Sequence, residues 1–273
     1  MILPRRNCSN WGIILIVFFF GDIKLDAQTW RLFKKNDGID CKYFTTDNLC
    51  DIYIVTNKNE IIKFDDLGYF EGRYANKKMG NLASVDATNP FKILLFYPDF
   101  QTITLVDRLL NPISSLVLSD FGILQAKCVS MSENGNILVF DDATLKFYNF
   151  FIDGNGIVND KTFAISLPNL NPLQIVARNN SIYVLDERMG IVHFDAFGKF
   201  LERLDISDVT GFQILNDDII VAQNEGLFSL TSGTRTPKPI NLPTQESFKQ
   251  FKRLEKDKLF VQRGTSVDVY KHD

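Results

Sequence analysis

The chain has 273 residues, of which 45% are hydrophobic and 12% aromatic, and its formal net charge is −3. This size suits one all-β domain with a sizeable core, and 24 phenylalanines against 4 methionines favour strands over helices. The weak acidity argues against a protein that binds nucleic acid or anionic lipid. The only histidines are His193 and His272, which is one residue from the end, and this argues against a zinc site built on two or three converging histidines.

The first 27 residues have the composition of an export signal. Arg5 and Arg6 precede an apolar run from Trp11 to Gly21, which is about half the roughly 20 residues needed to span a bilayer. A signal-peptidase site fits after Ala27. We therefore predict that residues 1–27 form a cleaved signal peptide, that the mature chain has no transmembrane segment, and that it is periplasmic or associated with the cell surface.

An apolar strand of nearly constant form recurs through residues 28–273 at spacings of 37 to 45 residues. Periods of about 40–50 residues that contain several strands are the signature of propeller blades. We therefore predict a single all-β domain, a six-bladed β-propeller of four-stranded antiparallel blades. The blades are expected at about residues 41–75, 82–118, 127–167, 173–205, 211–242 and 248–272.

The first repeat predicts the four strands of a blade at Lys42–Asp47, Ile52–Asn57, Glu60–Phe64 and Tyr69–Tyr74. The connection between the third and fourth strands reads F-D-x-x-G here, and it does so again at Phe194–Gly198. An aspartate can accept hydrogen bonds from its own backbone and glycine tolerates a positive φ, so this pattern predicts a tight turn.

Two stretches, Asp51–Tyr74 and Ser181–Leu204, follow the pattern I-Y-V…I…F-D-x-x-G-x-F and resemble NHL-type propeller repeats. The other four repeats match only in the apolar strand and its spacing. The second repeat has no glycine at the turn, Asp107–Leu110, and the fifth is abbreviated at Gly226–Leu230. The resemblance implies an architecture and leaves the function open.

The ends of the chain predict how the ring closes. The last repeat has three strands, at Phe248–Leu254, Leu259–Gln262 and Val267–Lys271, and no fourth. The strand-like segment Thr29–Lys35 precedes the first complete blade, and we expect it to complete the last one, which leaves no unpaired gap. The alternative is a mobile leader, against which Trp30, Leu32 and the alternation of the segment argue.

Two further segments and the three cysteines after residue 27 also carry structural predictions. Residues 151–170 are expected to form a long connection in the third blade, and residues 231–243 the connection around the fourth strand of the fifth blade. Cys41, Cys50 and Cys128 are irregularly spaced and are expected to be small buried hydrophobes, although a bridge between Cys41 and Cys50 stays possible.

The sequence predicts no catalytic residues and no cofactor. His193 is expected to be an ordinary exposed strand residue. The alternative is a calcium-dependent hydrolase or lyase, or a carbohydrate binder, that uses the central channel, since hard cations take oxygen ligands from loops. Acids follow several second strands, at Asp141, Asp142, Asp186, Glu187 and Glu225. The equivalent positions in other blades are Thr56, Tyr97 and Arg263, so the acids do not form a ring.

Binding of a protein partner is the preferred interpretation. In propellers the connections between second and third strands share one face with the connections between blades. Exposed aromatic and charged side chains there would suit a protein, although Phe100 could instead fold back onto the core. The expected partner-binding residues are Lys58, Asn59, Lys77, Lys78, Met79, Tyr97, Phe100, Asp142, Arg188, Met189, Glu225 and Arg263.

The short signal and the Ala-Gln junction resemble those of Gram-negative envelope proteins, particularly of the Bacteroidetes type. This resemblance implies a scaffolding subunit of a secretion or outer-membrane complex.

Overall fold

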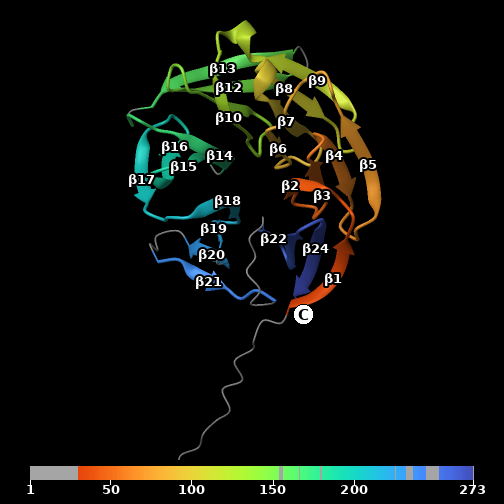
Figure 1. Cartoon of the computed structure of the whole chain (residues 1–273). Coiled ribbons are helices and arrows are strands. Elements are labelled where there is room, and N and C mark those ends of the chain that lie inside the picture. The colour runs from red at the N-terminus through yellow and green to blue at the C-terminus, as the bar shows by residue number, and fades with distance from the viewer. Residues whose placement is uncertain are drawn as a thin grey trace, which may run out of the picture.

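The computed structural model describes residues 30–153, 156–165, 167–178, 180–224, 226–231, 236–243 and 252–272. These residues form six four-stranded antiparallel sheets that stand in a ring (Figure 1). The structure confirms an all-β propeller of six blades. In the described part of the chain, no helix has the length and apolarity needed to cross a bilayer.

Each blade is numbered here in chain order. Blade 1 holds β2 (Cys41–Thr46), β3 (Ile52–Thr56), β4 (Glu60–Phe64) and β5 (Phe70–Ala75). Blade 2 holds β6 (Ser84–Asp86), β7 (Ile93–Tyr97), β8 (Thr102–Val106) and β9 (Pro112–Val117), with the 3-10 turns η1 (Pro98–Phe100) and η2 (Leu118–Phe121). Blade 3 holds β10 (Ala126–Met131), β11 (Ile137–Asp141), β12 (Lys146–Asp153) and β13 (Gly156–Ala164).

Blades 4 and 5 follow the same order. Blade 4 holds β14 (Pro172–Arg178), β15 (Ser181–Asp186), β16 (Gly190–Asp195) and β17 (Phe200–Leu204). Blade 5 holds β18 (Val209–Leu215), β19 (Asp218–Gln223), β20 (Gly226–Thr231) and the short β21 (Lys238–Ile240). Residues 231–243 thus contain the fourth strand of this blade, as expected.

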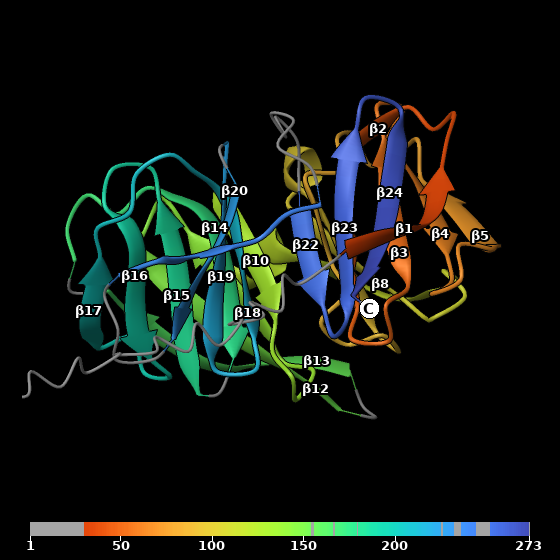
Figure 2. The same cartoon turned by 90° about the horizontal axis from the view of Figure 1, so that it is seen from below.

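Blade 6 is built from both ends of the chain. It holds β22 (Lys252–Glu255), β23 (Lys258–Arg263) and β24 (Ser266–His272), and β1 (Trp30–Asn36) pairs antiparallel with β24 (Figure 2). The Trp30 ring meets His272 edge-on at 5.4 Å, and its Nε1 donates to the carbonyl oxygen of Asn241 at 2.7 Å. The first described strand is therefore bonded to the last one and also to the neighbouring blade.

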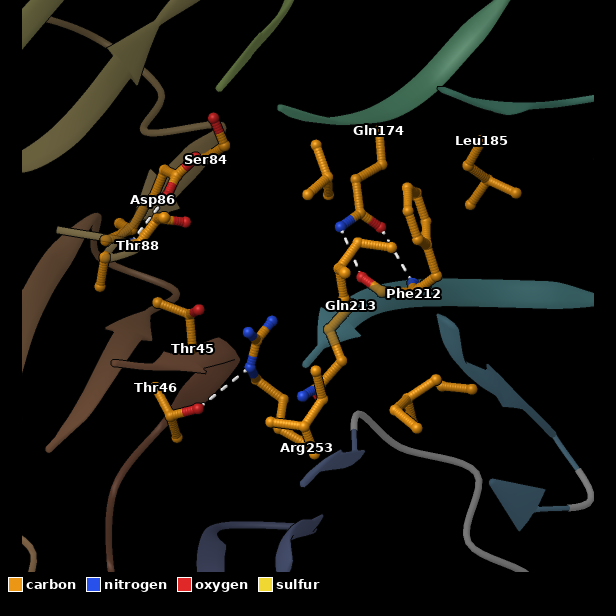
Figure 3. Close-up of a pocket in the computed structure, with 18 of the residues that line it drawn as sticks. Thr45, Thr46, Ser84, Asp86, Thr88, Gln174, Leu185, Phe212, Gln213 and Arg253 are labelled. Carbon is orange, nitrogen blue, oxygen red and sulfur yellow. Dashed lines mark hydrogen bonds between the residues drawn. The ribbon is translucent and has the colours of Figure 1, made fainter. Parts of the chain in front are cut away.

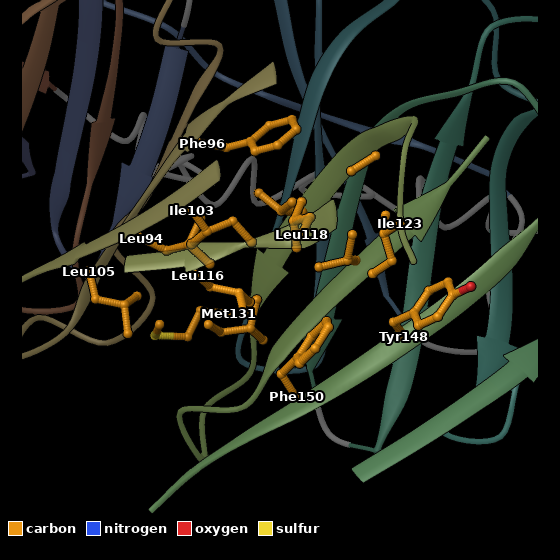
Figure 4. Close-up of a cluster of buried hydrophobic side chains, with 14 residues drawn as sticks. Leu94, Phe96, Ile103, Leu105, Leu116, Leu118, Ile123, Met131, Tyr148 and Phe150 are labelled. Atoms are coloured by element: carbon orange, nitrogen blue, oxygen red, sulfur yellow. The ribbon is translucent and has the colours of Figure 1, made fainter. Parts of the chain in front are cut away.

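The core consists of apolar clusters between neighbouring blades. The largest lies between blades 2 and 3, where Leu94, Phe96 and Ile103 meet Met131 and Phe150 (Figure 4). A strand that is buried on both faces carries apolar residues at successive positions. This explains why the second strands are apolar without interruption. Burying each large side chain contributes about 1.5–3 kcal/mol.

The third blade corrects one expectation. Residues 151–170 were expected to form a long connection, but β12 and β13 continue as one hairpin in which Phe151 lies opposite Val158. Phe150 is fully buried and Phe151 is 47% exposed, which is the alternation of a strand with one covered face. That alternation, rather than turn-forming residues, decides the local structure.

The turns between third and fourth strands in blades 1, 2 and 4 share one construction. Asp65, Asp107 and Asp195 each accept hydrogen bonds from the backbone N–H groups two and four residues later, at 2.7–3.0 Å. Gly68 has φ +80°, and in the second blade Leu110 takes the same place at φ +66°. Leu110 is 3% exposed, so its burial offsets the backbone strain that glycine would avoid.

All three described cysteines are free and buried, so Cys41 and Cys50 form no bridge. Burial raises the pKa of the Cys41 and Cys128 thiols to about 12 and that of Cys50 to about 11. Because the thiolate is the reactive form, these side chains behave as packing residues.

Candidate functional site

One face of the ring gathers the connections on which a partner site was expected. Backbone hydrogen bonds tie the turns between second and third strands to the connections between blades. They run from the amides of Asn57, Asp142 and Glu187 to the carbonyl oxygens of Asp40, Gln125 and Asn171 at 2.9–3.2 Å. We call this surface the BC face, after the turns between the second (B) and third (C) strands of the blades.

Three of the expected segments meet on the BC face at the junction of blades 1 and 2. Asn59 Nδ2 donates to the carbonyl oxygen of Gly80 at 3.4 Å, and the amide of Asn81 donates to Asp99 Oδ2 at 2.8 Å. These bonds join the β3–β4 turn, the loop after β5 and the η1 turn. We define the blade 1–2 patch as Lys58, Asn59, Lys77, Lys78 and Phe100.

Phe100 stands out of this patch because its turn is anchored on both sides. Asp99 is held by Asn81, and the Gln101 amide group bonds the backbone N–H and C=O of Ala126 in blade 3 at 2.6 and 3.3 Å. The Phe100 side chain is 56% exposed. It therefore points to solvent rather than back onto the core.

At the junction of blades 1 and 2, the expected partner residues Tyr97 and Met79 are directed inward. Tyr97 is the last residue of β7 and is 1% exposed, because it packs with Val85, Tyr74 and Met79 between blades 1 and 2. Met79 is half-buried in the same cluster. The expectation that Tyr97 presents its ring to a partner is wrong, because the loop begins only at Pro98.

The other expected residues are distributed around the ring. Asp142 is exposed, 3.9 Å from Lys127 Nζ. Arg188 is exposed, whereas the neighbouring Met189 packs against the core between blades 3 and 4. Arg263 is half-buried, with its guanidinium 5.8 Å from the centre of the Tyr270 ring. Glu225 lies outside the described residues.

Two of the carboxylates considered for calcium, Asp141 and Asp186, hold turns. Asp141 accepts from the amides of Gln125 and Thr144 and from the Thr144 hydroxyl at 2.6–3.2 Å, and Asp186 accepts from three amides at 2.5–2.9 Å. The Thr56 hydroxyl accepts two amides at the equivalent place in blade 1. Within the described ranges, no three His, Cys, Asp or Glu side chains converge as a ligand set for a metal.

His193 is not the exposed residue that its strand position suggested. Its side chain is 16% exposed and its ring stacks on Tyr183 at 4.3 Å with an angle of 11°. Nδ1 lies 3.5 Å from Glu202 Oε1. The two rings pair because β15 and β16 place Tyr183 directly opposite His193.

A second candidate site, which the sequence reasoning missed, is a cavity of about 520 Å³ along the ring axis (Figure 3). The first strands of the blades line it. Gln174 exchanges two hydrogen bonds with the backbone of Phe212 at 2.8 and 3.1 Å, and Gln213 does the same with Leu254 at 2.5 and 3.1 Å. Glutamines in otherwise apolar first strands were the available signal for these links.

No family model matches the sequence, and no curated protein matches it. The fold is similar to solved propeller structures. One is a streptogramin B lyase, with a TM-score of 0.62 and 10% identity over 90% of this chain and 100% of that chain. The WD40 repeats of RRP9 give a TM-score of 0.61 and 9% identity over 90% and 98% of the two chains. A chain of a mitotic checkpoint complex gives 0.57 and 10% over 99% and 98%.

Identities this low show the fold alone. The shared architecture hosts a lyase and repeats of other kinds, so function must be argued from the side chains of this chain.

Proposed function

We propose that this chain is a non-catalytic propeller that binds a protein partner through the blade 1–2 patch. The observation that carries the proposal is Phe100, an aromatic ring that is 56% exposed on a turn anchored to two neighbouring segments. Rigid, exposed aromatic side chains are the residues most often found at the centre of protein interfaces.

The charges around Phe100 indicate what the partner offers. Lys58, Lys77 and Lys78 are exposed, and none has an acidic partner among the described residues. A group of like charges without ionic partners favours binding of an oppositely charged surface and raises the rate at which that surface associates. We infer a partner segment that carries acidic residues beside an apolar side chain.

The setting is part of the proposal. The signal-like residues 1–27 support export, and we propose that the propeller, of NHL-like type, acts as a scaffolding subunit in the cell envelope, within a secretion or outer-membrane complex. Buried cysteines with raised pKa values are compatible with an oxidising compartment.

The test is affinity capture of the full chain from detergent-solubilised envelopes of its own host. We expect one stoichiometric protein, and we expect Phe100→Ala combined with Lys77→Glu and Lys78→Glu to lose it. The matched control combines Phe91→Ala with Lys199→Glu. Phe91 is 65% exposed in the β6–β7 connection and Lys199 is exposed in the β16–β17 turn, both away from the BC face.

Two results would contradict the proposal. One is a partner that the patch variant retains as well as the wild-type chain does. The other is capture of no protein at stoichiometric yield from any envelope fraction.

A further inference from the structure

The axial cavity presents hydrogen-bond donors for which no described residue supplies an acceptor. Figure 3 shows the Arg253 guanidinium directed into the cavity. Its Nε donates to Thr46 Oγ1 at 3.1 Å and its Nη2 lies 3.6 Å from Glu255 Oε1. Nη1 has no partner among the described residues. Two contacts therefore hold the Arg253 side chain in place, and within the described part of the chain they leave Nη1 available to donate to a ligand.

A second arginine lines the same cavity from blade 4. Arg178 Nη2 lies 3.2 Å from Glu133 Oε1, while its buried Nε has no hydrogen-bond partner among the described residues. A buried guanidinium N–H without a partner costs free energy unless water or a ligand accepts from it. Arg178 and Arg253 both line this one cavity.

The acids of the cavity are already occupied by donors of the protein. Asp47 accepts from two amides and from the Tyr53 hydroxyl at 2.9–3.0 Å. Asp86 accepts from the amides of Thr88 and Met131 and from a serine hydroxyl at 2.7–3.1 Å. Glu255 accepts from the Thr46 hydroxyl at 3.1 Å. Asp47 and Asp86 thus each have three donors from the protein, whereas the buried Nε of Arg178 has no acceptor among the described residues.

We propose that the axial cavity is a binding site for a carboxylate, with Arg253 as the principal donor and Arg178 as the second. The planar guanidinium matches a carboxylate and can bind it through two parallel hydrogen bonds. The volume of about 520 Å³ lies within the range of roughly 300–1,000 Å³ typical of small-molecule sites. The carboxylate belongs either to a small solute or to the C-terminus of a peptide.

This inference is independent of the blade 1–2 patch, because it concerns the first strands and not the loops of the BC face. The links from Gln174 to Phe212 and from Gln213 to Leu254 hold adjacent first strands together. The cavity is thus formed before a ligand arrives, which keeps the ordering cost of binding low.

The experiment is calorimetric titration of the purified full chain with three probes: citrate, tetraglycine with a free C-terminus and tetraglycine with an amidated C-terminus. We expect binding of citrate or of free tetraglycine, and at least tenfold weaker binding of the amidated peptide. Binding of citrate alone identifies a solute site, and binding of the free peptide alone identifies a site for a chain terminus.

Variants assign the binding to the arginines. Arg253→Gln should weaken binding more than tenfold, Arg253→Lys should restore only part of it, and Arg178→Gln should weaken it less. The control is Arg73→Gln, whose side chain is 57% exposed on the outer strand β5. The Phe100→Ala variant should bind the probes as the wild-type chain does, which separates this proposal from the proposed function.

The comparison of free and amidated peptide uses the wild-type chain, so it stands even if an Arg253 variant fails to fold. The proposal is overturned if citrate and free tetraglycine both fail to bind. It is also overturned if amidation makes no difference and citrate does not bind, or if a folded Arg253→Gln variant binds as the wild-type chain does.

Discussion

Blades 1 and 4 have the same strand order and the same F-D-x-x-G turn. They differ at one equivalent position, the third-strand residue that lies opposite a tyrosine of the second strand. In blade 1, β4 places Lys63 opposite Tyr53, and in blade 4, β16 places His193 opposite Tyr183. Lys63 is fully buried, with Nζ 2.8 Å from Asp51, 2.5 Å from Glu71 and 3.1 Å from the carbonyl oxygen of Arg108. The His193 side chain is 16% exposed and stacks on its tyrosine.

The outer strands and the following blade cause the difference. The residue opposite Lys63 on β5 is Gly72, whereas His193 faces Glu202 on β17. A Cβ at Gly72 would lie 3.5 Å from the carbonyl oxygen of Leu109, so the β8–β9 turn of blade 2 packs over this position, and the guanidinium of Arg108 reaches Asp51 at 3.1 Å. Strand pairing thus decides which residues are opposite, and the neighbouring blade decides which are buried.

The largest expected effect is that of removing the buried ammonium. Lys63→Met removes the buried cation shared by Asp51 and the partly exposed Glu71, and it leaves Asp51 with Arg108 as its remaining cationic partner. Breaking a buried ion pair costs about 3–5 kcal/mol. The measurement is the free energy of unfolding from a urea titration. A loss below about 1 kcal/mol would mean that blade 2 does not exclude water from the charged group of Lys63, Asp51 and Glu71.

The equivalent change in blade 4 should cost less. His193→Ala removes a ring stack, and an aromatic pair contributes about 0.5–1.5 kcal/mol beyond its buried area. The same urea titration compares the two variants directly. Equal losses for Lys63→Met and His193→Ala would contradict the distinction drawn between the two blades.

The shared turn should give equal effects in both blades. Asp65→Ala and Asp195→Ala each remove a carboxylate that accepts two backbone N–H groups near the surface, so we expect each to cost about 1 kcal/mol. A difference of more than about 1 kcal/mol between the two variants would show that the turns are not equivalent.

The smallest expected effect is a dependence on pH that belongs to blade 1. Burial, with a smaller contribution from Asp51, raises the pKa of the Asp47 carboxyl above its ordinary value of 3.8. Between that value and the raised pKa, the folded chain binds more protons than the unfolded chain, so stability falls as pH rises through this window.

Asp47→Asn should remove part of this slope. Glu255, whose pKa burial also raises, should keep the rest. Thermal unfolding between pH 3.5 and 7 is the measurement. A slope of the opposite sign, or one unchanged in Asp47→Asn, would contradict the assignment.

The sequence predicts the blades well because each blade repeats a local pattern. The apolar second strands and the Asp-containing turns depend on residues within a few positions of one another, and their spacing sets the number of blades. The β12–β13 hairpin was missed because its alternation lies in a segment that also contains turn-forming residues. Leu110 shows that a missing glycine need not change a turn when burial offsets the strain.

The candidate sites are predictable only in part, because they depend on contacts between blades. The loop positions of Lys58, Lys77 and Phe100 follow from strand spacing, but only the fold shows that Asn59 and Asp99 bring these segments together. The burial of Tyr97 depends on blade 1. The axial cavity brings together Arg178 and Arg253, which are 75 positions apart in the chain.

The central claim, that the BC face binds a protein through the blade 1–2 patch, is tested most directly by crosslinking in living cells. Phe100 and, in a separate variant, Phe91 are replaced by the photoreactive p-benzoylphenylalanine. We predict that light links position 100 to one protein rich in acidic residues, and that position 91 gives no such product. Crosslinking at position 91 with equal yield, or none at position 100, would contradict the claim.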